Sequence, residues 1–143
     1  MCLKIIEQKY SIDKPLVVKE KGKKYKIGWK LVKPGRKKTE WEASHQYTRY
    51  PYNKWLIEDS DDEIRSDDFK YNPKGFDFYE TYPMGFHICK TREDARKYKK
   101  EFSDIGFKVG SVVKVRYQDI VAIGTQFGCN VIVARKIFVE RNK

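Results

Sequence analysis

Apolar and polar residues alternate along several short segments of the chain, which is the period of a β-strand with one buried face. The clearest case covers residues 25–32, where one face carries Tyr25, Ile27, Trp29 and Leu31 and the other carries Lys26 and Lys30. This pattern predicts a half-buried strand whose lysines lie in solvent. It ends at Pro34-Gly35, a pair typical of turns.

Weaker patterns of the same kind predict further strands at residues 3–8, 15–19, 54–57, 75–79, 86–89, 111–117, 119–124 and 131–139. In the last of these, residues 131–134 are apolar on both faces, which favours a central position in the sheet. Residues 82–85 and 125–128 have the composition of turns.

One segment has the period of a helix instead. Ala95, Tyr98 and Phe102 recur at i, i+3 and i+7, and they follow Thr91, a favoured N-cap residue, with acidic residues in the first turn. This pattern predicts an amphipathic helix over residues 92–103 that packs on the sheet through those three side chains. The whole chain is therefore expected to have an α+β fold, with a mostly antiparallel sheet, one helix and long loops.

Length and charge refine this picture. A chain of 143 residues fits a single domain, residues 1–143, and its formal net charge of +11 favours polyanionic partners. The charge is uneven, because residues 58–80 carry nine acidic and three basic side chains between two basic regions. Neighbouring carboxylates repel one another, so we expect residues 58–74 to form a mobile acidic loop.

Several classes of function lack their signatures in the sequence. No apolar stretch is long enough to span a membrane, and the three cysteines include no CxxC pair, so we expect a cytoplasmic protein without disulfides or zinc. The motifs GxSxG, HExxH, GxGxxG and the P-loop are absent from the sequence. We therefore assign no catalytic residue, metal ligand or cofactor, and the oligomeric state stays open.

Aromatic and basic residues interleave most densely between residues 47 and 55. Single-stranded nucleic acid and nucleotides are held by this mixture, because cations follow phosphates and rings stack on bases. The predicted ligand-binding residues are Tyr47, Arg49, Tyr50, Tyr52 and Lys54, together with His87. The alternative for the loop is an aromatic plug over the open end of the sheet, and the alternative for His87 is a structural role in the core.

Short motifs in the second half of the chain carry a resemblance. Gly85-Phe86-His87 is followed by Thr91-x-x-x-Ala95, and the chain begins with Met1-Cys2-Leu3. Together with Gly124-x-x-x-Gly128 and residues 133–136, these motifs resemble a set of small uncharacterised phage and prophage proteins. The resemblance covers mainly residues 85–139. It implies a phage-encoded protein in the host cytoplasm, of a kind that is often an antagonist of bacterial defence.

The leading prediction is thus a non-enzymatic, phage-encoded binding protein for nucleic acid or a nucleotide-type anion. Two alternatives stay open. Residues 85–91 are also weakly similar to part of the ADP-ribosyltransferase-like fold, which would give His87, Tyr98 and Glu140 roles in an enzyme acting on NAD. The acidic loop would alternatively dock on a host defence protein and inhibit a nucleic-acid-binding complex.

Overall fold

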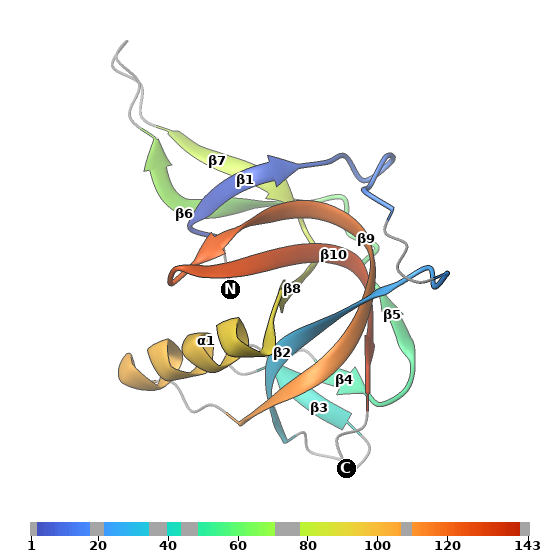
Figure 1. The fold of residues 1–143 in the computed structure, drawn as a ribbon. Coiled ribbons are helices and arrows are strands. Elements are labelled where there is room, and N and C mark those ends of the chain that lie inside the picture. Colours follow the sequence, from blue (N-terminus) through green and yellow to red (C-terminus); the bar gives the residue numbers. More distant parts are fainter. Residues whose placement is uncertain are drawn as a thin grey trace.

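The computed structural model describes residues 3–17, 22–34, 40–43, 49–70, 78–106 and 110–140. Within them it is built from short strands and one helix (Figure 1). The strands are β1 (Ile5–Lys9), β2 (Lys26–Pro34), β3 (Glu40–Ala43), β4 (Arg49–Pro51), β5 (Trp55–Ile57), β6 (Glu63–Lys70), β7 (Phe78–Pro83), β8 (Phe86–Cys89), β9 (Ser111–Gln126) and β10 (Cys129–Val139), and the helix is α1 (Arg92–Asp104). The predicted α+β class, mostly antiparallel sheet with a single helix, is confirmed.

The main sheet closes on itself. Strand β9 pairs with β10, β10 with β8, β8 with β2, and β2 returns to β9, so that these four strands form a ring. The ring is extended by β1 along β9, by β5 along β10, and by β3 and β4 beyond β2. All of these pairings are antiparallel. The central position predicted for the last strand is correct, because β10 has partners on both sides.

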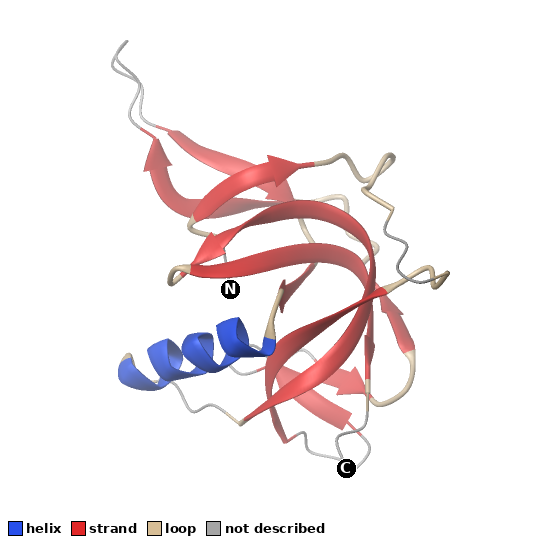
Figure 2. Ribbon diagram, in the orientation of Figure 1, coloured by secondary structure: helices blue, strands red, loops and turns tan. Residues whose placement is uncertain are grey.

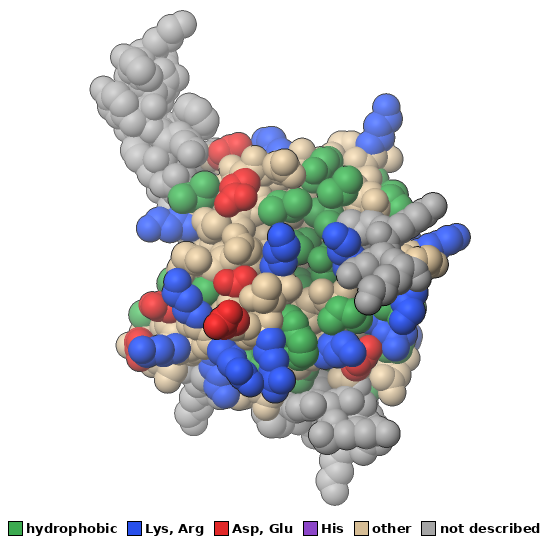
Figure 3. All heavy atoms as spheres, in the orientation of Figure 1, with side chains coloured by type: hydrophobic (Ala, Val, Ile, Leu, Met, Phe, Trp, Pro, Cys, Tyr) green, Lys and Arg blue, Asp and Glu red, His purple; other side chains and the backbone are tan. Residues whose placement is uncertain are grey.

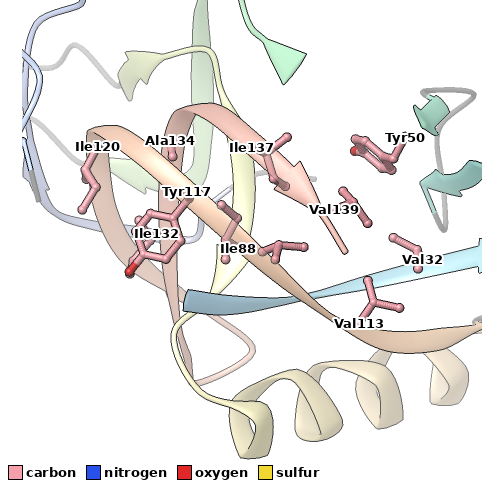
Figure 4. Packing of buried hydrophobic residues seen from close by; sticks show 11 residues of the cluster. Val32, Tyr50, Ile88, Val113, Tyr117, Ile120, Ile132, Ala134, Ile137 and Val139 are labelled. Carbon is pink, nitrogen blue, oxygen red and sulfur yellow. The ribbon is translucent and has the colours of Figure 1, made fainter. Parts of the chain in front are cut away.

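The inside of the ring is the principal core (Figure 4). Its members come from inward-facing positions of the ring strands and from β4: Val32, Tyr50, Ile88, Val113, Val115, Tyr117, Ile120, Ile132, Ala134, Ile137 and Val139. Gly28 lets β2 approach β8 closely, because a Cβ atom at this position would collide with the side chain of Ile88. The inner face of β2 is thus buried inside the ring, while Leu31 on its outer face is buried against the residues of α1.

Strand β9 is longer than the sequence predicts. Separate strands were expected at residues 111–117 and 119–124, but the structure has one strand from Ser111 to Gln126. Asp119 takes a left-handed conformation (φ 59°), and the register with β10 shifts between Val133 and Ala134. The expected boundary between two strands is thus only an irregularity within one strand, whose first part pairs with β2 and whose last part pairs with β1.

The helix agrees with its prediction closely. Thr91 is the N-cap, and its Oγ1 accepts a hydrogen bond from the Asp94 backbone N–H at 3.0 Å. Ala95, Tyr98 and Phe102 are all buried. They pack on outward-facing residues of the ring, including Leu31, Cys89 and Cys129, so α1 lies outside the ring against one part of it (Figure 2).

The acidic loop predicted at residues 58–74 is wrong for residues 63–70, whereas residues 58–62 contain no helix or strand. Residues 63–70 form β6, which pairs with β7 in a two-stranded sheet, and residues 71–74 lie outside the described part. An apolar contact supports this pairing. Ile64 of β6 pairs with Tyr82 of β7 and packs against a second buried cluster, to which Tyr82 and Val121 belong. The strand expected at residues 15–19 is also wrong where it is described, since only Leu16 forms a bridge there, to Ile120.

Candidate functional site

Tyr50, in the middle of the predicted binding segment, is buried in the structure. Tyr50 is 3% exposed, belongs to the core inside the ring, and meets the ring of Phe86 edge-to-face at 6.2 Å. Its face cannot stack on a ligand without unfolding this packing. For Tyr50, the structure favours the alternative of an aromatic plug at the end of the sheet.

The other members of that predicted site have separate settings. Tyr52 is half-buried and Lys54 is exposed. Arg49 is placed by its backbone in β4, and Tyr47 lies outside the described residues. The structure thus describes no shared surface formed by these four residues and Tyr50.

His87 is a buried residue of β8, only 6% exposed. Its Nε2 lies 2.8 Å from the hydroxyl oxygen of Tyr82, and that oxygen accepts a hydrogen bond from the backbone N–H of Leu3, also at 2.8 Å. This chain of contacts ties the start of the polypeptide to β7 and β8. The geometry therefore favours the structural role for His87 over a role in ligand binding.

Lys30 is the clearest departure from the sequence pattern. It was expected in solvent, but it is 5% exposed and points into the ring together with Gly28 and Val32. Its Nζ donates a hydrogen bond to the carbonyl oxygen of His87 at 2.8 Å and lies 5.3 Å from the centre of the Tyr50 ring.

The environment of Lys30 changes its acid–base chemistry. Burial lowers the pKa of Lys30 to about 8, because the charged amine loses its hydration. In contrast, burial raises the pKa of the nearby Cys89 thiol to about 12. The prediction failed because closure of the ring encloses the face of β2 that carries Lys30, whereas Tyr25, Ile27 and Trp29 on the other face stay partly exposed.

The three residues that an ADP-ribosyltransferase-like site would need have different partners. His87 contacts Tyr82 in the core, and Tyr98 donates a hydrogen bond to Gln126 under the helix at 2.9 Å. Glu140 forms ion pairs on the outside of the sheet. The described structure thus gives no observation that favours a common catalytic site of these residues.

A different group of aromatic and basic side chains gathers on the outer face of the ring. Neighbouring strands β2, β9, β10 and β5 place Ile27, Arg116, Phe138 and Trp55 side by side, since Ile27 pairs with Arg116, Arg116 with Phe138, and Phe138 with Trp55. These positions face outward, because the residues next to Arg116 and Phe138 in sequence, such as Tyr117 and Ile137, point into the core. All four are partly exposed.

The contacts within this group are aromatic and cation–π contacts. The Arg116 guanidinium carbon lies 4.9 Å from the ring centre of Tyr25 and 4.8 Å from that of Phe138. The Trp55 ring lies 5.5 Å from Phe138 and 6.4 Å from Tyr25. We call Tyr25, Trp55, Arg116 and Phe138 the outer-face cluster.

Charged residues surround the outer-face cluster. Glu140 accepts a hydrogen bond from Arg116 Nε at 2.9 Å and lies 3.9 Å from Lys114 Nζ, and Asp119 lies 3.3 Å from Lys136 Nζ. The side chains of these three cations, Lys114, Arg116 and Lys136, are between 35% and 47% exposed. Exposed Lys23, 5.7 Å from the centre of the Tyr25 ring, adds a further positive charge. The immediate surroundings are thus net positive.

On the surface around α1, positive and negative side chains are mixed. Figure 3 shows one face, on which Lys and Arg side chains are interspersed with Asp and Glu around α1. An open groove of about 650 Å³ lies between the end of β1 and the start of β6, and its lining includes Lys9 and three carboxylates, those of Asp13, Asp61 and Glu63. Those carboxylates would repel a phosphate, so the groove is a poor site for a polyanion.

The sequence pattern marks Lys54 and the segment that ends at Trp55, but it does not mark Tyr25, Arg116 or Phe138 as ligand candidates. The alternation around residues 113–117 does indicate that Arg116 lies on the other face of the strand from the buried Val115 and Tyr117. What brings Arg116 to the three rings is the pairing of four strands distant in sequence, which alternation does not encode.

Comparisons with known proteins give no relative: no family model, curated protein or solved structure matches the chain. Among the residues that the structure describes, no three His, Cys, Asp or Glu side chains gather in a way that could hold a metal ion. The helix α1, the one helix in the described ranges, is neither long nor apolar enough to cross a membrane.

Proposed function

We propose that the protein binds nucleic acid and that the outer-face cluster is its contact surface. The observation that carries the proposal is the guanidinium of Arg116, which lies against the rings of Tyr25 and Phe138 beside Trp55 on a partly exposed sheet face. Cations neutralise phosphates, and aromatic rings and guanidinium planes stack on bases.

The backbone supports the same conclusion. The four side chains come from β5, β9 and β10 and from Tyr25, which directly precedes β2, so hydrogen-bonded strands hold most of the cluster in place before a ligand arrives. Side chains that are ordered in advance lose less conformational entropy on binding. A mobile loop with the same residues would bind more weakly for that reason.

A purely structural role for the cluster is the competing explanation, because Trp55 and Phe138 also hold the short strand β5 against β10. The two explanations differ for Lys114, whose side chain is 47% exposed and lies at the edge of the cluster. A structural cluster has little need of this charge, whereas a phosphate passing over Arg116 would be attracted by it.

The test is the affinity of the full chain for a fluorescein-labelled 20-nucleotide strand of mixed sequence, measured by anisotropy at several KCl concentrations. Affinity should fall as salt rises, and Lys114→Gln should weaken binding severalfold and make the salt dependence shallower by about one unit of slope. Lys100→Gln, the same charge change on an exposed residue of α1, is the control and should have a smaller effect.

Two results would overturn the proposal. The first is the lack of salt-dependent binding to any DNA or RNA, single-stranded or duplex, at low salt. The second is an equal loss for the Lys114 and Lys100 variants, which would show a diffuse attraction of the whole basic protein. The role as a phage-encoded antagonist of bacterial defence rests on the sequence resemblance alone and stays a prediction.

A further inference from the structure

We propose, on the basis of the function proposed above, that the ligand is a single strand whose bases stack at two places on the outer face of the ring. The first is the outer-face cluster with Trp55 and Phe138. The second is Trp29, further along β2, where the sheet meets α1. Cations on β9 lie between the two places.

The second place repeats the chemistry of the first. The guanidinium carbon of Arg92, at the start of α1, lies 5.4 Å from the centre of the Trp29 ring. Trp29 is half-buried against the cluster of residues that includes Tyr98 and Phe102 of α1, and Arg92 is exposed. A tryptophan face paired with an exposed guanidinium is again a combination that suits a base and its phosphate.

The register of the sheet joins the two places on one face. Ile27 pairs with Arg116, and Trp29 pairs with Lys114, so the two pairs are consecutive outward-facing positions of β2 and β9. The step between them is about 7 Å along the strands. A chain that crosses from Trp55 to Trp29 would therefore pass over Arg116 and Lys114, which carry the charges that its phosphates need.

Selectivity for a single strand follows from how the rings lie. Four rings are each half-buried in the surface of the sheet, those of Tyr25, Trp29, Trp55 and Phe138. They therefore form a platform and do not project into the groove of a duplex. In a duplex the faces of the bases are covered by their neighbours. Only unpaired bases can turn a face toward such rings, which is how aromatic platforms hold single strands.

The experiment uses the wild-type chain and three labelled 20-nucleotide ligands: a mixed-sequence DNA strand, the duplex of that sequence, and a strand with the same phosphates but with abasic residues throughout. We expect the normal strand to bind at least tenfold more tightly than either of the others. Tryptophan fluorescence should be quenched by the normal strand and not by the abasic strand.

Variants locate the stacking. Trp55→Leu and Trp29→Leu should each reduce the preference for the normal strand over the abasic strand, while Trp55→Phe should retain most of it. Urea unfolding of each variant checks that the fold is intact. The ligand series on the wild-type chain tests the preference for unpaired bases without any variant, and an unchanged preference in Trp55→Leu or Trp29→Leu would overturn that tryptophan as a stacking place.

The outcomes separate the two proposals. Equal affinity for the normal and abasic strands, or for the single strand and the duplex, would overturn this inference and leave nucleic-acid binding by charge in place. Failure of all three ligands to bind at low salt would overturn the proposed function together with it.

Discussion

Because the amine of Lys30 is buried, we expect the free energy of unfolding to depend on pH in a specific way. The pKa of this amine is about 8 in the folded protein and 10.5 is the ordinary value, which we take for the unfolded chain. Below pH 8 both states hold the proton, and the folded state bears the full cost of burying the charge. Between pH 8 and 10.5 the unfolded state binds more protons, so this cost disappears as the pH rises.

The size of the effect follows from the shift in pKa. A lowering of about 2.5 units corresponds to about 3 kcal/mol at pH 7, using about 1.36 kcal/mol for each unit. The variant Lys30→Met keeps a long, unbranched side chain and removes the charge. It also leaves the His87 carbonyl without the Lys30 donor, which costs roughly 1–3 kcal/mol at any pH.

The pH dependence separates these two contributions, because only the charge changes with pH. The stability of Lys30→Met relative to wild type should fall by about 2 kcal/mol between pH 7 and pH 9.5. The wild-type chain alone would not show this cleanly. The raised pKa of Cys89 acts in the opposite direction, since its unfolded thiol ionises above pH 9 and thereby destabilises the fold.

Urea unfolding in the presence of a reducing agent, followed by far-ultraviolet circular dichroism at half-unit steps of pH, measures the difference. Cys89 and the buried Tyr50 are present in both proteins, so their titration largely cancels. A difference that stays constant from pH 7 to 9.5 would refute the reasoning, because it would mean that the amine keeps its ordinary pKa and reaches water.

Two further changes test the packing. Phe102→Ala should lower the free energy of unfolding by about 3–5 kcal/mol, because Phe102 is 4% exposed beneath the helix; a loss below about 1 kcal/mol in urea unfolding would contradict this. Tyr82→Phe removes the hydroxyl shared by Leu3 N–H and His87 and should cost about 1–3 kcal/mol. Tyr10→Phe, whose hydroxyl makes an exposed contact, is the control and should cost less than about 0.5 kcal/mol; equal losses would argue against the buried network.

Local features of the fold could be predicted from the sequence because they depend on neighbouring residues. The N-cap at Thr91 and the spacing of Ala95, Tyr98 and Phe102 define the helix and its buried face, and both are confirmed. The alternation at residues 113–117 likewise predicts a strand that the structure contains. These signals need no knowledge of what the element packs against.

Features that depend on closure of the sheet could not be predicted in this way. Lys30 looks like a solvent residue in the sequence, and only the return of β2 to β9 encloses it. The outer-face cluster has the same origin, because Arg116 meets Phe138 and Tyr25 only when distant strands pair. Aromatic and basic residues are dense in residues 47–55, and this density predicts a binding site. In the structure, however, the ring of Tyr50 packs in the core.

The central claim is that nucleic acid binds at the outer-face cluster, and Glu140 offers the most direct test of it. Its carboxylate accepts a hydrogen bond from Arg116 and lies near Lys114, so a phosphate at this place would be repelled by it. Removing one charge about 4 Å away in a water-like environment changes the energy by about 1 kcal/mol.

Glu140→Gln should therefore bind the labelled 20-nucleotide strand about fivefold more tightly than wild type in the anisotropy assay. Asp104→Asn makes the same change in net charge at the exposed end of α1 and should change affinity little. A gain is informative because loss of structure cannot produce it. Affinity that is unchanged in Glu140→Gln, or raised equally in both variants, would contradict the assignment of this face as the binding surface.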